Sequence, residues 1–321
     1  MKTESASPSS ARTTSSGRTG SLYRGRFAPS PTGDLHFGSL VAAVGSYLDA
    51  RHAQGEWLIR IEDVDTTREI PGSANRIVEG LRLLGFEWTE SIVRQSERTD
   101  LYRTALERLI AAGHAYACSC SRAEIQSAMA DESNADEIRY PGWCRFGPRA
   151  PDRSLALRLR VSAGPICFKD LVQGELCIDV DREVGDFVIR RRDGLFAYQL
   201  AVAIDDAEQG ITHVVRGADL LTSTPRQLLI QQALGLPNPL YAHLPVAIDP
   251  NGVKLSKSAG AAGLDFNRPA YEVWRALRFL RQDPPEELSS GSLERVWHWG
   301  IAHWNPTRIC GLRSQRVELT P

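Results

Sequence analysis

The chain has 321 residues, of which 42% are hydrophobic and 24% are charged, and these values are ordinary for a globular protein. The 38 lysine and arginine residues nearly balance the 39 acidic residues. This excludes an overall basic field, so a nucleic-acid partner would have to be held by a local basic patch. No apolar run approaches the roughly 18 residues needed to cross a bilayer, and no signal-peptide core is present. We therefore expect a cytoplasmic protein with no membrane contact.

Residues 1–22 are mainly serine, threonine, arginine and glycine, with almost no apolar residues. Such a segment buries too little apolar surface to offset the entropy lost on ordering, so its composition predicts a disordered tail. A transit peptide is the alternative, but the segment lacks the pattern of an amphipathic helix.

Residues 25–48 predict a strand, a tight turn and a helix. Two prolines and a glycine mark the turn, and Asp34 is the predicted N-cap of the helix. Backbone N–H groups and the positive end of the helix dipole meet at such a turn and favour an anion. We expect a phosphate group there, beside His36, Gly38 and Ser39, although a turn of this kind more often binds nothing. The helix follows from the spacing of its apolar residues Leu40, Ala43, Val44, Tyr47 and Leu48.

Residues 56–61 form a short apolar run that predicts a buried parallel strand, and an acidic segment beginning at Glu62 follows it. Because ligands of open parallel sheets bind beyond the carboxyl ends of the strands, we expect Glu62 near the phosphate turn. A solvated acidic loop is the alternative. Helices over 73–85 and 97–112, each closed by a glycine, and a short strand at 116–118 continue the alternation. This order predicts a doubly wound α/β domain.

The α/β pattern breaks between residues 118 and 182, which we interpret as an insertion. Cys118, Cys120 and Cys144 bring three thiols together if this segment folds back, and zinc prefers four tetrahedral ligands. Cys-x-Cys is a loose signal, so unliganded cysteines are the alternative. The fourth ligand stays open among Tyr140, His114 and an acidic residue in 131–137, because the free pKa of tyrosine is about 10 and phenolate ligands are uncommon. We interpret the remaining cysteines as ordinary core or surface thiols, namely Cys167, Cys177 and Cys310.

The α/β pattern returns with predicted strands at 186–190 and 211–217 and predicted helices over 225–234 and 270–282. Between these helices, the loop 252–258 places two lysines three residues apart among hydroxyl side chains. By itself such a loop is usually only solvated surface. The C-terminal tail holds three tryptophans but is too short for a large second domain.

Two short motifs resemble the two signatures of class I aminoacyl-tRNA synthetases, commonly written HIGH and KMSKS. They are His36-Phe37-Gly38-Ser39 and Lys254-Leu255-Ser256-Lys257-Ser258. The segments 26–33, 60–65, 193–201 and 215–219 further resemble the catalytic domain of glutamyl-tRNA synthetases, and the resemblance covers roughly residues 23–282. It implies a doubly wound, Rossmann-like α/β catalytic domain.

The resemblance also implies how the chain is divided. The catalytic domain has two halves, 23–117 and 183–285, and the second half carries the KMSKS-like loop. A zinc-containing α+β insertion at 118–182 separates them, and a short C-terminal extension follows at 286–321. The helical anticodon-binding domain of the family is missing from this plan.

The resemblance implies a site for glutamate and a site for ATP. The residue types fit, because a guanidinium group suits a carboxylate and an anionic carboxylate suits an ammonium group. Without the resemblance, Arg216 could equally belong to a structural ion pair and Tyr198 to the core. The implied glutamate site comprises Arg26, Phe27, Ala28, Pro29, Ser30, Glu62, Tyr198 and Arg216. The implied ATP site comprises His36, Gly38, Ser39, Lys254, Ser256 and Lys257, with His36 and Lys257 as the catalytic residues.

Two metals follow from the same resemblance. Mg²⁺ is expected to bind together with ATP and needs no dedicated cage of protein ligands. One structural Zn²⁺ ion is expected in the insertion, held by Cys118, Cys120, Tyr140 and Cys144.

Within the family, three features resemble a truncated paralogue: leucine in the lysine loop, phenylalanine after the first histidine, and the missing anticodon-binding domain. This resemblance implies a monomer that activates L-glutamate with ATP and transfers it to queuosine at the wobble position of tRNA(Asp). We predict that RNA phosphates contact Arg139, Arg145, Arg149 and Arg153, the alternative being a solvated basic face.

Other functions stay open at this point. A short glutamyl-tRNA synthetase that charges a tRNA 3′ end is disfavoured by the missing anticodon-binding domain. A catalytically inactive, tRNA-binding paralogue predicts the loss of residues such as His36, Glu62 or Lys257, all of which are present. A nucleotidyltransferase with the same phosphate turn would not require Arg26, Tyr198 and Arg216 together.

Overall fold

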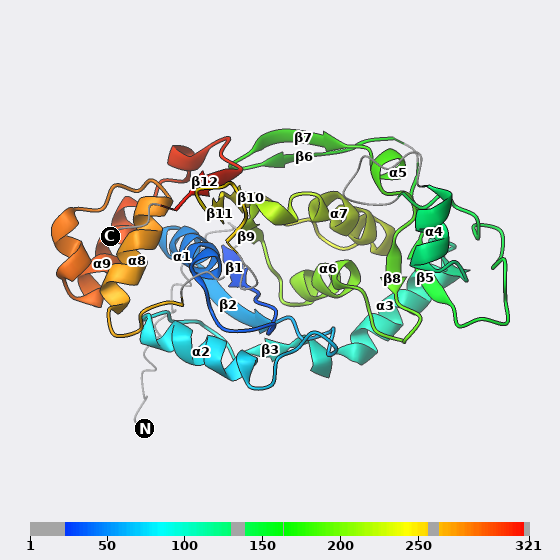
Figure 1. Ribbon diagram of the computed structural model, residues 1–321, viewed down its shortest axis with the longest axis horizontal. Helices are drawn as coiled ribbons and strands as arrows, with labels where there is room; N and C mark the ends of the chain where they lie inside the picture. The colour runs from blue at the N-terminus through cyan, green and yellow to red at the C-terminus, as the bar shows by residue number, and fades with distance from the viewer. Residues whose placement is uncertain (1–22, 130–138, 163, 256–262, 318–321) are drawn as a thin grey trace, which may run out of the picture.

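The computed structural model describes residues 23–129, 139–162, 164–255 and 263–317. The molecule is elongated, with α8 (Pro269–Phe279) and α9 (Leu293–His303) at one end and α4 (Arg122–Ala128) at the other (Figure 1). Among the described residues, no helix combines the length and apolar character that crossing a membrane requires.

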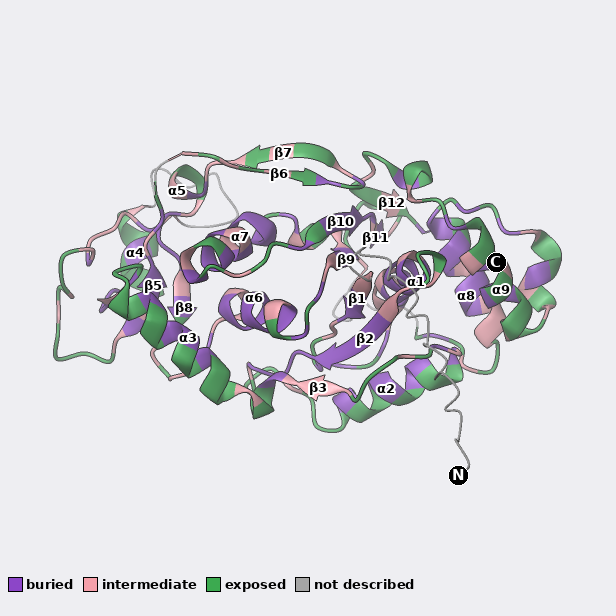
Figure 2. Cartoon of the chain, turned by 180° about the vertical axis from the view of Figure 1, so that it is seen from behind, coloured by how far each residue is buried: buried purple, intermediate pink, exposed green. Residues whose placement is uncertain are grey.

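A mixed seven-stranded sheet forms the centre of the fold. Its neighbouring strands are parallel, except that β6 and β7 form an antiparallel hairpin. Strands β1 and β2 are largely buried (Figure 2), as expected for a parallel sheet that is covered on both faces. The predicted α/β class is therefore confirmed. The strand order is β3 (Val93–Arg94), β2 (Glu56–Ile61), β1 (Arg24–Phe27), β9 (His213–Gly217), β10 (Leu240–Leu244), β6 (Ile166–Asp170) and β7 (Gly174–Ile178).

The sheet reverses its winding between β1 and β9. From β1 the chain moves outward through β2 to β3, and it later returns to the other side of β1 as β9 before continuing to β10. In open α/β sheets a crevice forms outside the carboxyl ends of the strands at such a switch point. A ligand is therefore expected at the ends of β1 and β9.

Helix α1 (Phe37–His52) packs on β1 and β9 and against α8 and α9, and it buries the whole predicted apolar face. Its predicted N-cap, Asp34, is wrong. His36 caps the helix, because it has the extended backbone directly before the first turn and its Nδ1 accepts the Ser39 N–H at 3.4 Å. Asp34 lies too early and instead pairs with Arg76 at 2.6 Å. Helix α2 (Ser73–Leu83) begins at the residue that the sequence predicts.

A second hydrophobic core lies between three helices and a separate antiparallel sheet. The helices are α3 (Thr99–Ala111), α6 (Tyr198–Glu208) and α7 (Ser223–Leu234), and the sheet consists of β4 (Ala115–Cys118), β5 (Ala156–Leu159) and β8 (Val188–Arg190). The expectation that the segments 116–118 and 186–190 continue the α/β alternation is wrong. Both segments pair with β5, so their backbone groups are satisfied away from the main sheet.

Strands β6 and β7 lie inside the predicted insertion 118–182, yet β6 pairs with β10 of the main sheet. Cys167 and Cys177 face each other across this hairpin and form a disulfide, with their Cα atoms 4.1 Å apart. Their interpretation as ordinary thiols is therefore wrong, because the antiparallel register sets them opposite each other and a spacing of 10 residues does not reveal it. Cys310 is an exposed free thiol, as expected. The domain limits at 118 and 182 stay a prediction.

The C-terminal extension contributes to the main core. Trp297 of α9 is buried, and the centroid of its ring lies 4.8 Å from the ring centroids of both Tyr47 and Phe86. Its Nε1–H donates a hydrogen bond to the carbonyl of Leu84 at 2.9 Å. Strand β12 (Ser314–Arg316) pairs with β11 (Val246–Ile248) beside the main sheet. The extension is therefore an integral part of the main folded unit.

Trp297→Ala should lower the free energy of unfolding by about 3–5 kcal/mol, the usual cost of deleting a large aromatic side chain from a core. Urea denaturation followed by circular dichroism measures the change. Trp299→Ala is the matched control, because Trp299 lies on the same helix, is only partly buried and stacks on His303. We expect a loss of about 1 kcal/mol there. Equal losses in the two variants would contradict a core role for the extension.

Candidate active site

One pocket of about 590 Å³ lies at the carboxyl ends of β1, β2 and β9, at the switch point of the sheet. Every described residue of the two predicted ligand sites lines this pocket. Ser256 and Lys257, which complete the predicted ATP site, lie outside the described residues. The roles of the individual residues stay predictions. The predicted residues in the pocket wall are Arg26, Phe27, Ala28, Pro29, Ser30, His36, Gly38, Ser39, Glu62, Tyr198, Arg216 and Lys254.

The first turn of α1 forms one wall of the pocket. His36 and Ser39 cap the helix reciprocally, since the Ser39 hydroxyl also accepts the His36 N–H at 2.9 Å. A Cβ atom at Gly38 would lie 3.1 Å from Cε1 of His36, so glycine leaves room for the imidazole ring. The positive end of the helix dipole therefore faces the pocket, which favours an anion at this wall.

A buried cluster of charges lies on the β1–β2 side, and its members Arg26 and Glu62 line the pocket. Arg60 of β2 is fully buried and contacts Asp206 at 2.8 Å and Glu62 at 3.2 Å. Arg26 of β1 contacts Asp206 at 3.1 Å. Burial alone would raise the pKa of Asp206, but Arg26 and Arg60 outweigh it and hold that pKa below its usual range. Asp206 is therefore a carboxylate whose charge is already matched.

The same two arginines also act on Glu62, but they do not offset the effect of its burial. Burial raises the pKa of Glu62 to about 7, although Arg60 and Arg26 act to lower it. Near neutral pH this carboxyl group is poised between acid and carboxylate, and a cation in the pocket would favour the carboxylate. Sequence reasoning found Glu62 but missed Asp206, whose signal is an acidic pair directly after the apolar run 200–204 of α6.

Arg216 of β9 supplies the opposite charge. Only 5% of its surface is exposed, and its guanidinium donates to His243 Nε2 at 3.1 Å, Gln227 Oε1 at 2.9 Å and Thr224 Oγ1 at 2.8 Å. Within the described part of the chain, no acidic side chain lies within ion-pair distance, so the structural ion pair considered from the sequence is not found there. A buried cation without an anion is unfavourable, so this wall is suited to receive an anionic group.

Two further side chains complete the pocket. Lys254 is half exposed, and its Nζ contacts Asp219 Oδ2 at 2.6 Å. Tyr198 begins α6, and burial raises its pKa well above the usual range, so its hydroxyl stays protonated and can donate a hydrogen bond. The sequence analysis did not predict that Asp219 pairs with Lys254.

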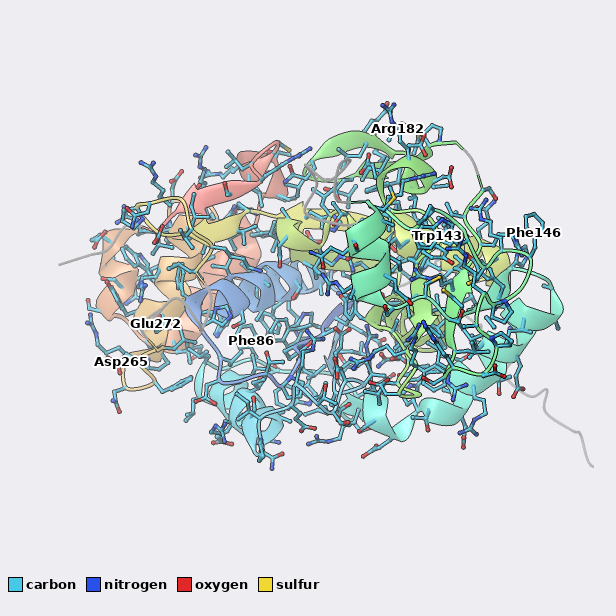
Figure 3. The ribbon with its side chains drawn as sticks, turned by 45° about the vertical axis from the view of Figure 1, so that its right-hand side comes forward. Phe86, Trp143, Phe146, Arg182, Asp265 and Glu272 are labelled. Carbon is cyan, nitrogen blue, oxygen red and sulfur yellow. A yellow bond between two sulfur atoms is a disulfide. The ribbon has the colours of Figure 1, made fainter. Side chains whose placement is uncertain are left out.

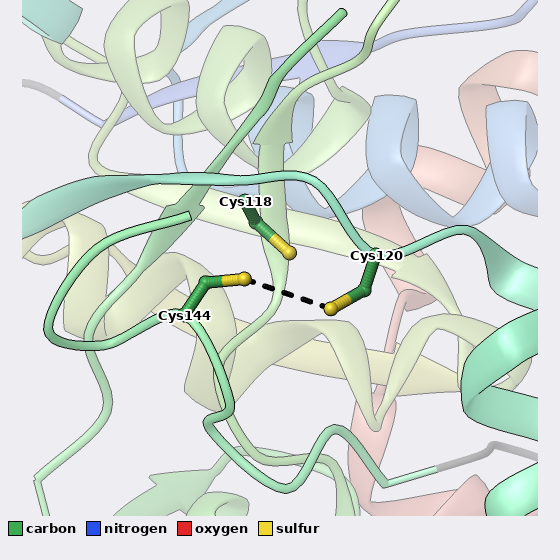
Figure 4. Close-up of side chains that lie close together, drawn as sticks. All are labelled: Cys118, Cys120 and Cys144. Atoms are coloured by element: carbon green, nitrogen blue, oxygen red, sulfur yellow. Dashed lines mark hydrogen bonds between the residues drawn. The ribbon is translucent and has the colours of Figure 1, made fainter. Parts of the chain in front are cut away.

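The three cysteines predicted to bind zinc meet at the end of β4. The Sγ atoms of Cys118, Cys120 and Cys144 lie within 4.8 Å of one another (Figure 4). Cys120 and Cys144 Sγ are 3.6 Å apart, and the Tyr140 hydroxyl lies 3.3 Å from Cys118 Sγ and 3.7 Å from Cys120 Sγ. Zinc–sulfur bonds of about 2.3 Å give a tetrahedron with edges of about 3.8 Å. The four donor atoms therefore fit a zinc ion.

The alternatives for the fourth zinc ligand fare differently. His114 is not part of the cysteine cluster among the described residues, and its side chain is exposed. The acidic residues in 131–137 lie outside the described residues. Tyr140 is buried in the cluster and its hydroxyl also accepts the Cys144 N–H at 2.9 Å. The described geometry thus favours Tyr140.

The cysteine thiols differ in acidity. Burial disfavours the Cys144 thiolate, but hydrogen bonds from the backbone N–H of Arg149 and the Tyr140 hydroxyl outweigh it and lower the pKa of Cys144 to about 6. Burial raises the pKa of Cys120 to about 11. A divalent cation would stabilise both thiolates.

Most of the arginines predicted to contact RNA are paired with acidic residues. The Nη2 atoms of Arg139 and Arg145 lie 3.7 and 3.4 Å from Asp181, and Arg153 contacts Glu124 at 2.6 Å. Arg149 differs, because its guanidinium lies over the Trp143 ring at 4.7 Å and it has no acidic partner among the described residues. Trp143 lies with the exposed Phe146 at the end of the molecule opposite Glu272 (Figure 3).

Comparisons with known proteins identify the family of this chain. The family described as tRNA synthetases class I (E and Q), catalytic domain, matches residues 23–279. The glutamyl-Q tRNA(Asp) synthetase of Dechloromonas aromatica is 55% identical over 284 residues, which cover 88% of this chain and 94% of that protein. The glutamyl-Q tRNA(Asp) synthetase of Geobacter sulfurreducens is 53% identical over 291 residues, which cover 89% and 93%.

A solved structure shows the same fold. The glutamate-tRNA synthetase of Elizabethkingia anophelis superposes with a TM-score of 0.78 at 26% identity, covering 93% of this chain and 68% of that chain. The chain therefore belongs to the class I tRNA synthetases of the E and Q type. Within that family, the two relatives named above, at 55% and 53% identity, are glutamyl-Q tRNA(Asp) synthetases, which confirms the resemblance.

Proposed function

We propose that this chain activates L-glutamate with ATP and transfers it to queuosine at the wobble position of tRNA(Asp). The observation that carries the proposal is one pocket that holds two opposite charges. It contains the buried Arg216 guanidinium, which has no acidic partner among the described residues, and the buried Glu62 carboxyl group. Glutamate offers carboxylates to the first and an ammonium group to the second. The names of the relatives contribute the nucleic-acid substrate, tRNA(Asp).

In the first step, the α-carboxylate of glutamate attacks the α-phosphorus of ATP. A bond forms between the carboxylate oxygen and phosphorus, the bond from phosphorus to the pyrophosphate oxygen breaks, and glutamyl-adenylate and pyrophosphate result. Such a displacement needs no enzyme nucleophile, only in-line positioning and stabilisation of the charge on the phosphate oxygens. We assign that stabilisation to His36 and the first turn of α1, to Lys254, and to Lys257 at the leaving group.

The remaining pocket residues hold the amino acid in this scheme. Arg26, Tyr198 and Arg216 hold carboxylate oxygens and Glu62 holds the ammonium group. The segment 27–30 and the residues Gly38 and Ser39 shape the walls around glutamate and ATP, and Ser256 joins the lysine loop. The roles of Arg216 and Glu62 follow the charges of the two pocket walls, and those of Arg26 and Tyr198 follow the family resemblance.

In the second step, a hydroxyl of the cyclopentene-diol of queuosine attacks the carbonyl carbon of the adenylate. AMP leaves, the hydroxyl proton passes to solvent, and an ester links glutamate to the tRNA. We propose Arg149, which has no acidic partner among the described residues, as the first candidate for a phosphate contact.

Two metal ions belong to the proposal. Mg²⁺ bound with ATP would neutralise phosphate charge. Zn²⁺ would be held by Cys118, Cys120, Tyr140 and Cys144, and its four ligands would leave no open position, so it would crosslink the segment between β4 and β5. We also propose that the chain works as a monomer in the cytoplasm, where tRNA is found, with the domain limits predicted from the sequence.

The proposed function is tested by ATP–pyrophosphate exchange and by transfer of labelled glutamate. We expect glutamate-dependent exchange without RNA, and transfer to tRNA(Asp) that carries queuosine but not to tRNA(Asp) that lacks it. Charging of tRNA(Glu) would favour a short glutamyl-tRNA synthetase. An absence of exchange with and without tRNA would favour an inactive tRNA-binding paralogue.

The KM for glutamate should fall as the pH rises through about 7. A raised pKa means that Glu62 is mostly protonated below that pH and cannot attract the ammonium group. Between pH 6 and pH 8 the ionised fraction changes about tenfold, which sets the upper limit of the effect. Exchange kinetics across this range measure it. Glu62→Gln is the control: its KM should be high and nearly independent of pH. A pH dependence that survives in this variant would assign the titration to another group.

Purified protein should contain one zinc ion per chain, measured by plasma mass spectrometry. Cys120→Ala should remove the ion and lower the melting temperature, because the segment between β4 and β5 loses its crosslink. Cys310→Ser is the matched control and should keep the ion, since Cys310 is an exposed thiol outside the cluster. Protein that is free of zinc and melts at the same temperature as the loaded form would refute the structural role.

A further inference from the structure

Three buried polar side chains form a line of contacts that ends at Arg216 in the pocket wall. Asp170, His243 and Arg216 lie at or near the carboxyl ends of the neighbouring strands β6, β10 and β9, and the register pairs His243 directly with Arg216. Asp170 is 1% exposed and His243 is fully buried. Neither Asp170 nor His243 lines the pocket. Buried polar groups of this kind are stable only when their hydrogen bonds are satisfied, so the line of contacts has a defined geometry.

The contacts of His243 fix its protonation. Its Nδ1 lies 2.6 Å from Asp170 Oδ2, and its Nε2 lies 3.1 Å from Nε of Arg216. A guanidinium only donates, so Nε2 must be the unprotonated acceptor and Nδ1 must carry the proton that is donated to Asp170. Burial holds the pKa of His243 below its usual range and Arg216 lowers it further, although Asp170 acts against both. The ring is therefore neutral and has one tautomer.

The far end of the line is anchored in the backbone. Oδ1 of Asp170 accepts the N–H groups of Val172 at 3.0 Å, Gln173 at 2.8 Å and His243 at 3.1 Å. Burial would raise the pKa of Asp170, but the hydrogen bonds from His243 and Gln173 outweigh it and keep the carboxylate ionised. A carboxylate held this way orients the imidazole and makes Nε2 a better acceptor.

Arg216 gains a fixed direction from these contacts. Its Nε–H is directed at His243, and its Nη2 donates to Thr224 Oγ1 at 2.8 Å. The guanidinium also lies over the ring of Tyr241, 5.4 Å from the centroid. Nη1 donates one of its two N–H groups to Gln227 Oε1 at 2.9 Å, which leaves the other N–H for a ligand in the pocket. Loss of the acceptor at Nε would leave a buried N–H without a partner and let the guanidinium turn away.

We propose that His243 and Asp170 are positioning residues that hold the Arg216 guanidinium in the orientation in which it receives a carboxylate of the amino-acid substrate. The inference rests on the proposed function, in which Arg216 binds glutamate. Neither residue touches the substrate. Their effect is therefore on the affinity for glutamate and not on the affinity for ATP or on the chemical step.

The test compares two substitutions of His243 in ATP–pyrophosphate exchange. His243→Asn can still donate to Asp170 but is too short to reach Arg216, and we expect the KM for glutamate to rise about tenfold, the size expected when an orienting hydrogen bond is lost. His243→Gln can place its carbonyl oxygen near the position of Nε2, and we expect a rise of no more than about threefold. The KM for ATP and kcat should stay nearly unchanged in both. His213→Asn, on β9 but outside the pocket wall, is the matched control and should match the wild type.

The outcomes separate this inference from the function on which it rests. Wild-type protein with no glutamate-dependent exchange overturns the proposed function and the inference together. An active wild type with an unchanged KM for glutamate in a folded His243→Asn variant overturns the inference alone, as does an equal effect of the Asn and Gln variants. If His243→Asn does not fold, Asp170→Asn tests the same line from its other end, and an unchanged KM there overturns the inference.

Discussion

The electrostatics of the site depend on one fully buried cation, Arg60. Three carboxyl groups surround it, with Asp206 at 2.8 Å, Glu62 at 3.2 Å and Asp205 at 3.9 Å. Asp206 has a second cation in Arg26, and Asp205 has one in Arg98 at 2.7 Å. Burial raises the pKa of Glu62 because Arg60 and Arg26 do not offset it, whereas the same two arginines outweigh burial at Asp206 and lower its pKa. The cluster therefore leaves the Glu62 carboxyl group available to a cationic ligand.

The opposite wall of the pocket reverses this arrangement. Arg216 is buried among uncharged acceptors, so it presents a positive charge without an anion from the described part of the chain. Both walls exist because the sheet reverses at β1 and β9: the ends of β1 and β2 carry one charge pattern and the end of β9 carries the other. A rigid pocket with charges fixed in advance suits an amino acid and loses little free energy to reorganisation. The positive end of the α1 helix dipole adds a third charged region of the pocket, which favours the phosphates of ATP.

The sequence was most informative where a signal is local. The apolar spacing from Leu40 to Leu48 and the run at 56–61 predicted α1 and β2 because periodic burial is written in neighbouring residues. The pairing of distant segments cannot be inferred from neighbouring residues. The separate sheet of β4, β5 and β8 and the Cys167–Cys177 disulfide were missed because they depend on which strands become neighbours. The site divides in the same way. Short motifs identified residues such as Glu62 and Arg216, whereas the contacts of Asp206 and Asp170 depend on which helices and strands become neighbours.

The most direct test of the two-walled pocket is a crystal structure with a non-hydrolysable analogue of glutamyl-adenylate. We predict that the ammonium group of the analogue lies within about 3 Å of a Glu62 carboxyl oxygen, that its free carboxylate lies equally close to Arg216, and that the phosphate mimic lies at the first turn of α1. An analogue bound with its ammonium group away from Glu62, or with Arg216 contacting only protein acceptors, would contradict the account.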